Sequence, residues 1–180
     1  MVNESVKVSG GFCLTMALVL LVVPFEWLLA AILAACFHEL CHYSAIRMLC
    51  GKCSCLKLYS YAAHMPLPEM SSGREMLCAL AGPIGAFSLL LFARWMPKLA
   101  ICAAMQSLYN LLPIYPLDGG RALRSGMLLF LSPPKAKALC RVLELLCKAG
   151  ISGLAVYGCF WLKLGIFPLL MAALLFIRVK

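Results

Sequence analysis

Two histidines and a glutamate are spaced so that they could hold and use a metal ion. His38, Glu39 and His42 form the pattern H-E-x-x-H within an otherwise apolar segment. Histidines four residues apart lie on one face of an α-helix, and ionisable side chains at membrane depth are costly and usually functional. The pattern predicts zinc ligands at His38 and His42, with Glu39 as the general base that activates a water molecule.

A catalytic zinc site needs a third protein ligand, and the sequence contains a single aspartate, Asp118. The stretch 110–121 around it has two prolines before the aspartate and two glycines after it. Prolines break helices, and glycines allow close backbone approach. Such a stretch suits a ligand that must reach a metal held by another helix. The alternative is that Asp118 caps a helix carrying Arg121 and Arg124, but the upstream motif favours the ligand.

The composition predicts an all-α, polytopic membrane protein. Hydrophobic residues make up 64% of the 180-residue chain, mean hydropathy is +0.96, and only 13% of residues are charged. Soluble domains have about 25% charged residues, and a chain of this length cannot hide the excess in its core. The net charge is +9, but the basic residues flank apolar runs. This placement of basic residues is typical of membrane proteins oriented against anionic lipid. We therefore expect the lipid bilayer to be a partner, and we expect no nucleic-acid binding.

Apolar runs predict about six transmembrane helices, at about 11–23, 27–48, 76–93, 99–112, 145–162 and 164–177. The first is interpreted as a membrane helix rather than a cleaved signal peptide. The fifth is expected to begin with a partly amphipathic stretch from Lys135. If both termini are cytoplasmic, only three of the 16 basic residues lie on the outer side of the membrane. These three are Arg94, Lys98 and Lys163. This bias predicts a multi-pass protein with both ends inside.

A single membrane-embedded domain, 1–180, is expected, with its catalytic core at about 27–124 and extra helices at 1–26 and 135–180. The longest polar connection, 51–73, follows the motif helix. Loose alternation from Cys53 to Tyr61 predicts a short strand or hairpin there. The edge of the strand-like stretch Leu56–Ala62 could accept an unwound substrate as an added strand, or the stretch could be part of a simple surface hairpin.

The polar connection also holds residues with metal-binding side chains. His64 is interpreted as a solvated loop histidine, with a substitute ligand, a gate or a proton carrier as the alternatives. Cys50, Cys53 and Cys55 form C-x-x-C-x-C, which could bind a second metal. No second cysteine pair with zinc spacing follows, so free thiols in a reducing compartment are favoured.

Three motifs occur in an order that resembles a known family. H-E-x-x-H is followed by Ala81-Gly82-Pro83 in the third apolar run, and then by N-x-x-P-x-x-P-L-D-G-G beginning at Asn110. Together they resemble the site-2 protease family of intramembrane zinc metalloproteases, over about 27–124. The six-span layout and the N-L-L-P-I-x-P-L-D-G-G-R stretch most resemble the branch of the stage IV sporulation protein FB.

The resemblance implies one Zn²⁺ per chain, bound by His38, His42 and Asp118, with Glu39 as the catalytic glutamate. It also implies a substrate cleft shaped by Asn110, Pro113, Gly82 and Pro83. Family members often carry an asparagine shortly after A-G-P, where this chain reads Ile84-Gly85-Ala86-Phe87. The resemblance therefore implies the zinc chemistry more firmly than substrate clamping by this helix.

The resemblance further implies a metalloendopeptidase of the bacterial cytoplasmic membrane. It would cleave a peptide bond in or near a membrane-associated segment of a regulatory protein, with a pro-sigma factor of sporulation as one candidate. Inhibitory membrane proteins are expected as partners.

Two other function classes remain open. A membrane metal-binding or transport protein without protease activity would need ionisable residues along a path, whereas the chain has seven acidic residues and one clustered site. An inactive scaffold would lack a ligand or the base, and all four residues are present.

Overall fold

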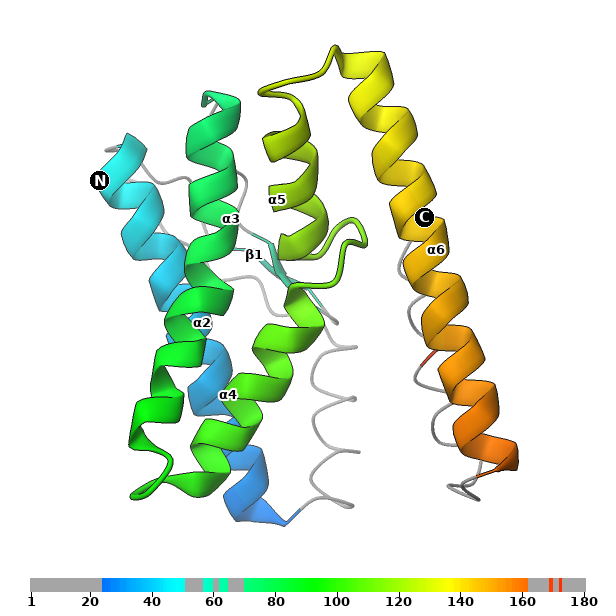
Figure 1. Cartoon of the computed structure of the whole chain (residues 1–180). Coiled ribbons are helices and arrows are strands. Elements are labelled where there is room, and N and C mark those ends of the chain that lie inside the picture. The colour runs from blue at the N-terminus through cyan, green and yellow to red at the C-terminus, as the bar shows by residue number, and fades with distance from the viewer. Residues whose placement is uncertain are drawn as a thin grey trace. The chain divides into compact units, whose positions relative to one another are not determined.

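The structure, a computed structural model, describes residues 24–50, 57–59, 62–64 and 70–161, together with Leu169 and Ala172. The chain divides into two compact units, Met1–Tyr109 and Asn110–Lys180. The elements, in chain order, are α2 (Phe25–Cys50), β1 (Lys57–Tyr59), β2 (Ala62–His64), α3 (Ser72–Phe87), the 3-10 helix η1 (Ser88–Phe92), α4 (Pro97–Asn110), α5 (Asp118–Met127) and α6 (Pro133–Phe160) (Figure 1).

Two helical segments of the first unit are long and apolar enough to cross a bilayer. They are Phe25–Leu49 and Ser72–Phe92. Only 28% of the most apolar window of each segment is buried, whereas a core helix of a soluble protein would be mostly covered. Apolar side chains such as Leu33, Leu40 and Leu91 are exposed on these segments. Long apolar helices with exposed apolar surface point to a membrane protein.

Small residues hold the helices of the first unit together. Ala34 of α2, Ala86 of α3 and Ala103 of α4 form one fully buried cluster. Figure 1 shows α2 and α3 running side by side, as expected for helices whose contact residues are small. Glu26 near the start of α2 forms an ion pair with Lys98 near the start of α4. The small contact residues bring α3 close to the helix that carries H-E-x-x-H.

A short antiparallel hairpin follows α2, in the connection where the sequence predicts one. The register pairs Lys57 with His64, Leu58 with Ala63 and Tyr59 with Ala62. His64 is therefore the last residue of β2, and its assignment to a loop was wrong. Lys57 and His64 face each other at the open end of this two-stranded ladder.

The second unit contains α5 and α6. Helix α6 begins at Pro133 and Pro134, residues well suited to a first helical turn, and runs without a break for 28 residues. It joins the amphipathic stretch from Lys135 and the fifth predicted span into one helix. The sulfur atoms of Met127 in α5 and Cys140 in α6 lie 3.6 Å apart where the two helices meet.

The predicted six-span layout is only partly described. The second, third and fourth runs correspond to α2, to α3 with η1, and to α4. The first run, 11–23, lies outside the described residues, and so does most of the sixth, in which Leu169 and Ala172 are helical. Six spans and the cytoplasmic termini therefore stay predictions.

Candidate metal centre

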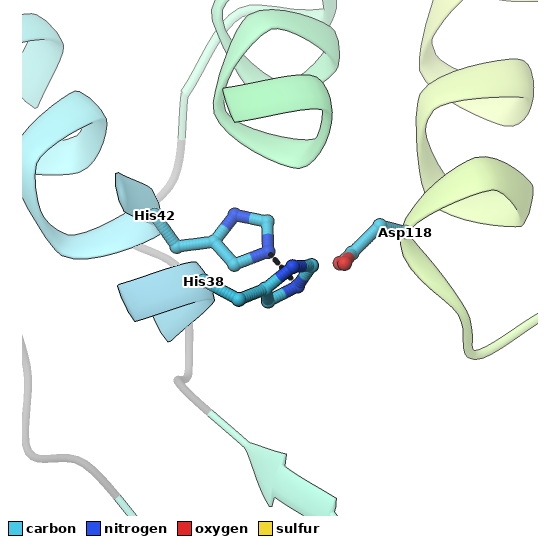
Figure 2. A group of neighbouring side chains, drawn as sticks. All are labelled: His38, His42 and Asp118. Carbon is cyan, nitrogen blue, oxygen red and sulfur yellow. Dashed lines mark hydrogen bonds between the residues drawn. The ribbon is translucent and has the colours of Figure 1, made fainter. Parts of the chain in front are cut away.

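His38 and His42 lie one turn apart on α2, and both are buried, at 2% and 8% exposure. Their Nε2 atoms are 3.1 Å apart, and the rings meet nearly edge to face (Figure 2). Two nitrogen ligands of a tetrahedral zinc, each about 2.0–2.1 Å from the metal, are about 3.3 Å apart. The observed separation therefore fits two ligands of one ion.

The tautomer of His42 is set by a backbone carbonyl on α3. His42 Nδ1 lies 2.7 Å from the oxygen of Cys78. A carbonyl can only accept a hydrogen bond, so Nδ1 must carry the proton. In the neutral ring, Nε2 then presents a lone pair, as a metal ligand requires.

Gly82 of α3 lies directly against the His42 ring. A Cβ atom at residue 82 would be 2.2 Å from Nε2 of His42. Gly85, one turn further, approaches Cys41 in the same way, with a hypothetical Cβ 2.3 Å from Sγ. Gly82 and Pro83 are both buried. The structure thus gives Gly82 a contact with a candidate ligand, while the predicted contribution of Gly82 and Pro83 to a substrate cleft stays a prediction.

Glu39 follows His38 directly on α2 and is half-buried. A general base must reach both the reacting water and a route for its proton. The position of Glu39 beside a candidate ligand suits that role, which stays a prediction.

Asp118 belongs to the second unit and is the first residue of α5. The N-cap position is occupied by Leu117, so the alternative prediction of Asp118 as a capping residue was wrong by one position. The carboxylate is nearly buried and pairs with Arg121, with 3.7 Å between Oδ1 and Nη1. A negative charge in the first turn is also favoured by the helix dipole.

The two glycines after Asp118 allow the preceding segment to lie against the start of α5. A Cβ at Gly119 would be 2.1 Å from the carbonyl oxygen of Leu111, and one at Gly120 would be 2.5 Å from the carbonyl carbon of Ile114. Backbone hydrogen bonds from Leu117 to Ile114 and from Ile114 to Leu112 fold this segment tightly. The close backbone approach expected from D-G-G is therefore confirmed.

His38 and His42 offer imidazole nitrogens and Asp118 offers a carboxylate, which are donor types that zinc accepts. The histidines belong to the first unit and the aspartate to the second. Asn110 and Pro113 are half-buried, at the end of α4 and just after it, and their predicted place in a substrate cleft stays a prediction.

Sequence reasoning missed two contacts to the candidate ligands. The contact with the Cys78 carbonyl could not be predicted from the residue type, because every residue has a backbone carbonyl. Arg121 stands within the L-D-G-G-R stretch, and its i,i+3 spacing from Asp118 could have indicated the pair. Of the other candidates, His64 lies in β2 and Cys50 ends α2, while Cys53 and Cys55 lie outside the described residues.

Comparison with known proteins finds solved structures of similar fold. No protein-family profile matches the sequence, and no curated protein matches it. The structure of the "Site-2 Protease from Methanocaldococcus jannaschii" matches with a TM-score of 0.61 and 18% sequence identity, over 92% of this chain and 83% of that one. At this identity the likeness establishes the fold alone, and the chain is therefore similar in fold to a site-2 protease.

Proposed function

We propose that the chain is an intramembrane zinc metalloprotease. The observation that carries this proposal is the His38–His42 pair: two buried imidazoles, with Nε2 atoms 3.1 Å apart, on a helix apolar enough to cross a bilayer. Two buried histidines in such a helix are costly unless they serve a function. The fold likeness to a site-2 protease supports the same reading.

Asp118 is the proposed third ligand. Two imidazoles and one carboxylate are a typical donor set for catalytic zinc, and they leave a fourth position for water. Arg121 restrains the carboxylate within α5, and the two glycines let the preceding segment lie close beside it. These local contacts would hold Asp118 ready for the metal.

Glu39 is the proposed general base. Zinc, when bound, lowers the pKa of its water to about 7 and polarises the substrate carbonyl. Glu39 would take a proton from the water whose oxygen bonds to the carbonyl carbon, and would give it to the amine released when the C–N bond breaks. The Cys78 carbonyl holds the His42 ring at Nδ1. This contact keeps Nε2 of His42 directed toward Nε2 of His38.

The position of the histidines along α2 indicates where a substrate would be cut. Glu26 precedes His38 by about 18 Å of helix, and Arg47 follows it by about 14 Å, at 1.5 Å per residue. The two polar ends are thus about as far apart as a hydrocarbon core is thick, about 30 Å. The metal centre would lie inside the membrane nearer the Arg47 end, which the charge bias puts on the cytoplasmic side. A peptide must unwind by about four extended residues to reach it from there.

The proposed substrate is a regulatory protein with a membrane-associated segment. The motif resemblance makes a pro-sigma factor of sporulation one candidate, and the cytoplasmic membrane of a bacterium the expected location. Partner membrane proteins that hold the enzyme inactive would be part of the same system.

The proposal is tested with the purified full chain in liposomes and a single-span model substrate whose membrane segment contains helix-breaking residues. Glu39→Gln should keep about one zinc per chain and abolish cleavage, because it removes the base and no ligand. His38→Ala and Asp118→Ala should lose both zinc and cleavage. Glu75→Gln, which changes a carboxylate of α3 outside the proposed centre, should keep both.

Two results would contradict the proposal. Wild-type cleavage by Glu39→Gln would remove Glu39 from the reaction, and full zinc binding by Asp118→Ala would remove the third ligand. Zinc flux across the same vesicles that survives Glu39→Gln, without cleavage by the wild type, would instead favour a metal-transport protein.

A further inference from the structure

Residue 82 lies against the metal-binding edge of His42. A Cβ there would be 2.2 Å from Nε2 and 2.6 Å from both Cδ2 and Cε1. These distances put an added methyl group over the ring beside Nε2. Real Cβ atoms essentially never come within 3.0 Å of heavy atoms beyond their own residue and its neighbours in the chain, so the ring can lie where it does only because residue 82 has no side chain.

The same ring is held at its other nitrogen by the turn of α3 that precedes Gly82. The carbonyl of Cys78 accepts a hydrogen bond from Nδ1 at 2.7 Å, and Cys78 is almost fully buried. One turn of α3 therefore fixes His42 twice: the carbonyl sets the tautomer and the ring rotation, and the bare backbone at Gly82 sets how closely the ring can approach.

We propose that Gly82 is a positioning residue for the metal ligand His42, acting together with the Cys78 carbonyl. This inference rests on the proposed function, and it assigns α3 a role in metal affinity rather than in substrate clamping. Any side chain at residue 82 must push the ring aside, which lengthens the bond to Cys78 and turns Nε2 away from that of His38. Changes to groups that orient a metal-bound histidine typically cost about 10- to 100-fold in metal affinity.

The chain offers a matched control one turn along α3. A Cβ at Gly85 would meet Sγ of Cys41 at 2.3 Å and its Cβ at 2.8 Å, so Gly85→Ala disturbs the same helix contact without touching a histidine. Cys41 neighbours His42 on α2 but is not one of the proposed ligands. A merely structural role for Gly82 predicts the same outcome for both alanine variants.

The first experiment measures metal binding by the full chain in detergent. Zinc affinity is determined by competition with a chromophoric chelator, and the visible absorption spectrum of the cobalt-loaded protein reports the ligand geometry. Gly82→Ala should bind zinc about 10- to 100-fold more weakly and shift the cobalt bands, whereas Gly85→Ala should match the wild type in both. Equal losses in the two variants, or wild-type values for Gly82→Ala, would overturn the inference.

The second experiment needs no metal and also covers a Gly82→Ala variant that folds poorly. The Tm of the metal-free chain is measured for Gly82→Ala alone and in a His42→Ala background, where the ring that the methyl would strike is absent. Gly82→Ala should lower Tm clearly in the first case and little in the second. An equal loss of Tm in both backgrounds, or a double variant that also fails to fold, would contradict the inference.

The two experiments separate the failure of this inference from failure of the proposed function. A wild-type chain that binds no zinc would refute the proposed function, while the Tm comparison would still decide whether Gly82 and His42 are coupled. A wild-type chain that binds zinc as tightly as Gly82→Ala would refute the inference and leave the proposed function standing.

Discussion

Arg121 and Asp118 form an ion pair within the first turns of α5, with Nη1 of the arginine 3.7 Å from Oδ1 of the aspartate. Both side chains are mostly buried. A partner that neutralises and orients a ligating carboxylate normally affects how well that carboxylate binds its metal. Arg121 should therefore contribute to metal affinity although it cannot itself bind a cation.

We predict that Arg121→Gln weakens zinc binding by about tenfold, because the Asp118 carboxylate loses the charge that restrains it. Arg121→Lys should recover only part of this affinity, since an ammonium group lacks the planar fork of a guanidinium. Chelator competition on the purified chain measures the change. Arg124→Gln is the control, because Arg124 is an exposed arginine on the same helix. An equal loss in the control would show that only the net charge of α5 matters.

The ion pair between Glu144 and Lys148 of α6 should stabilise the fold, and the contributions of the two residues should depend on each other. The carboxylate and ammonium groups are 2.6 Å apart, and their side chains are only 19% and 7% exposed. Changing one partner breaks this largely buried charge pair, and breaking similar buried pairs costs about 3–5 kcal/mol. Lys148→Met or Glu144→Gln alone should therefore lower the Tm in detergent sharply, and the double variant should be less destabilised than the sum of the two.

Lys137→Met provides the baseline for this comparison, because Lys137 is exposed on the same helix. Its effect on the free energy of unfolding should stay within about 0.5 kcal/mol. Additive losses in the Glu144 and Lys148 variants would mean that the two groups act independently.

The exposed side of α2 should tolerate charge at its end but not at its middle. Leu33 is 47% exposed and lies well inside the helix, whereas Met48 is 86% exposed and lies near its end. Leu33→Arg should reduce insertion of this helix into microsomal membranes, at a cost of about 2.5–3.5 kcal/mol. Met48→Arg should insert nearly as well as the wild type, because its side chain can reach the interface. Equal insertion of both variants, scored by glycosylation of an engineered site, would argue against a membrane-spanning α2.

Local patterns predicted the helix that holds His38 and His42 and the tight turn at the D-G-G glycines. Both depend on short-range rules: i,i+4 spacing along a helix, and glycine wherever two backbones meet. The hairpin was predicted in the right connection, but His64 was placed in a loop because strand register depends on pairing with Lys57 rather than on residue type.

Contacts between elements could not be predicted from residue types. The hydrogen bond from His42 to the Cys78 carbonyl depends on how α3 is rotated against α2, and the backbone group that accepts it is the same in every residue. Gly82 was assigned to a substrate cleft on the motif resemblance, and neither that resemblance nor the residue type indicates that the His42 ring lies against it. The amphipathic start of the fifth span, by contrast, was predicted from Lys135, and α6 runs through that stretch without a break.

The alanine cluster of Ala34, Ala86 and Ala103 limits how the first unit can move. An alanine has no rotamers, so the three side chains at the centre of the cluster, against which Leu89, Leu99 and Cys102 pack, cannot swing out of the way. The helices can part there only by displacement of whole backbones, which would expose several turns at once. Separation of the three helices at this seam is therefore disfavoured.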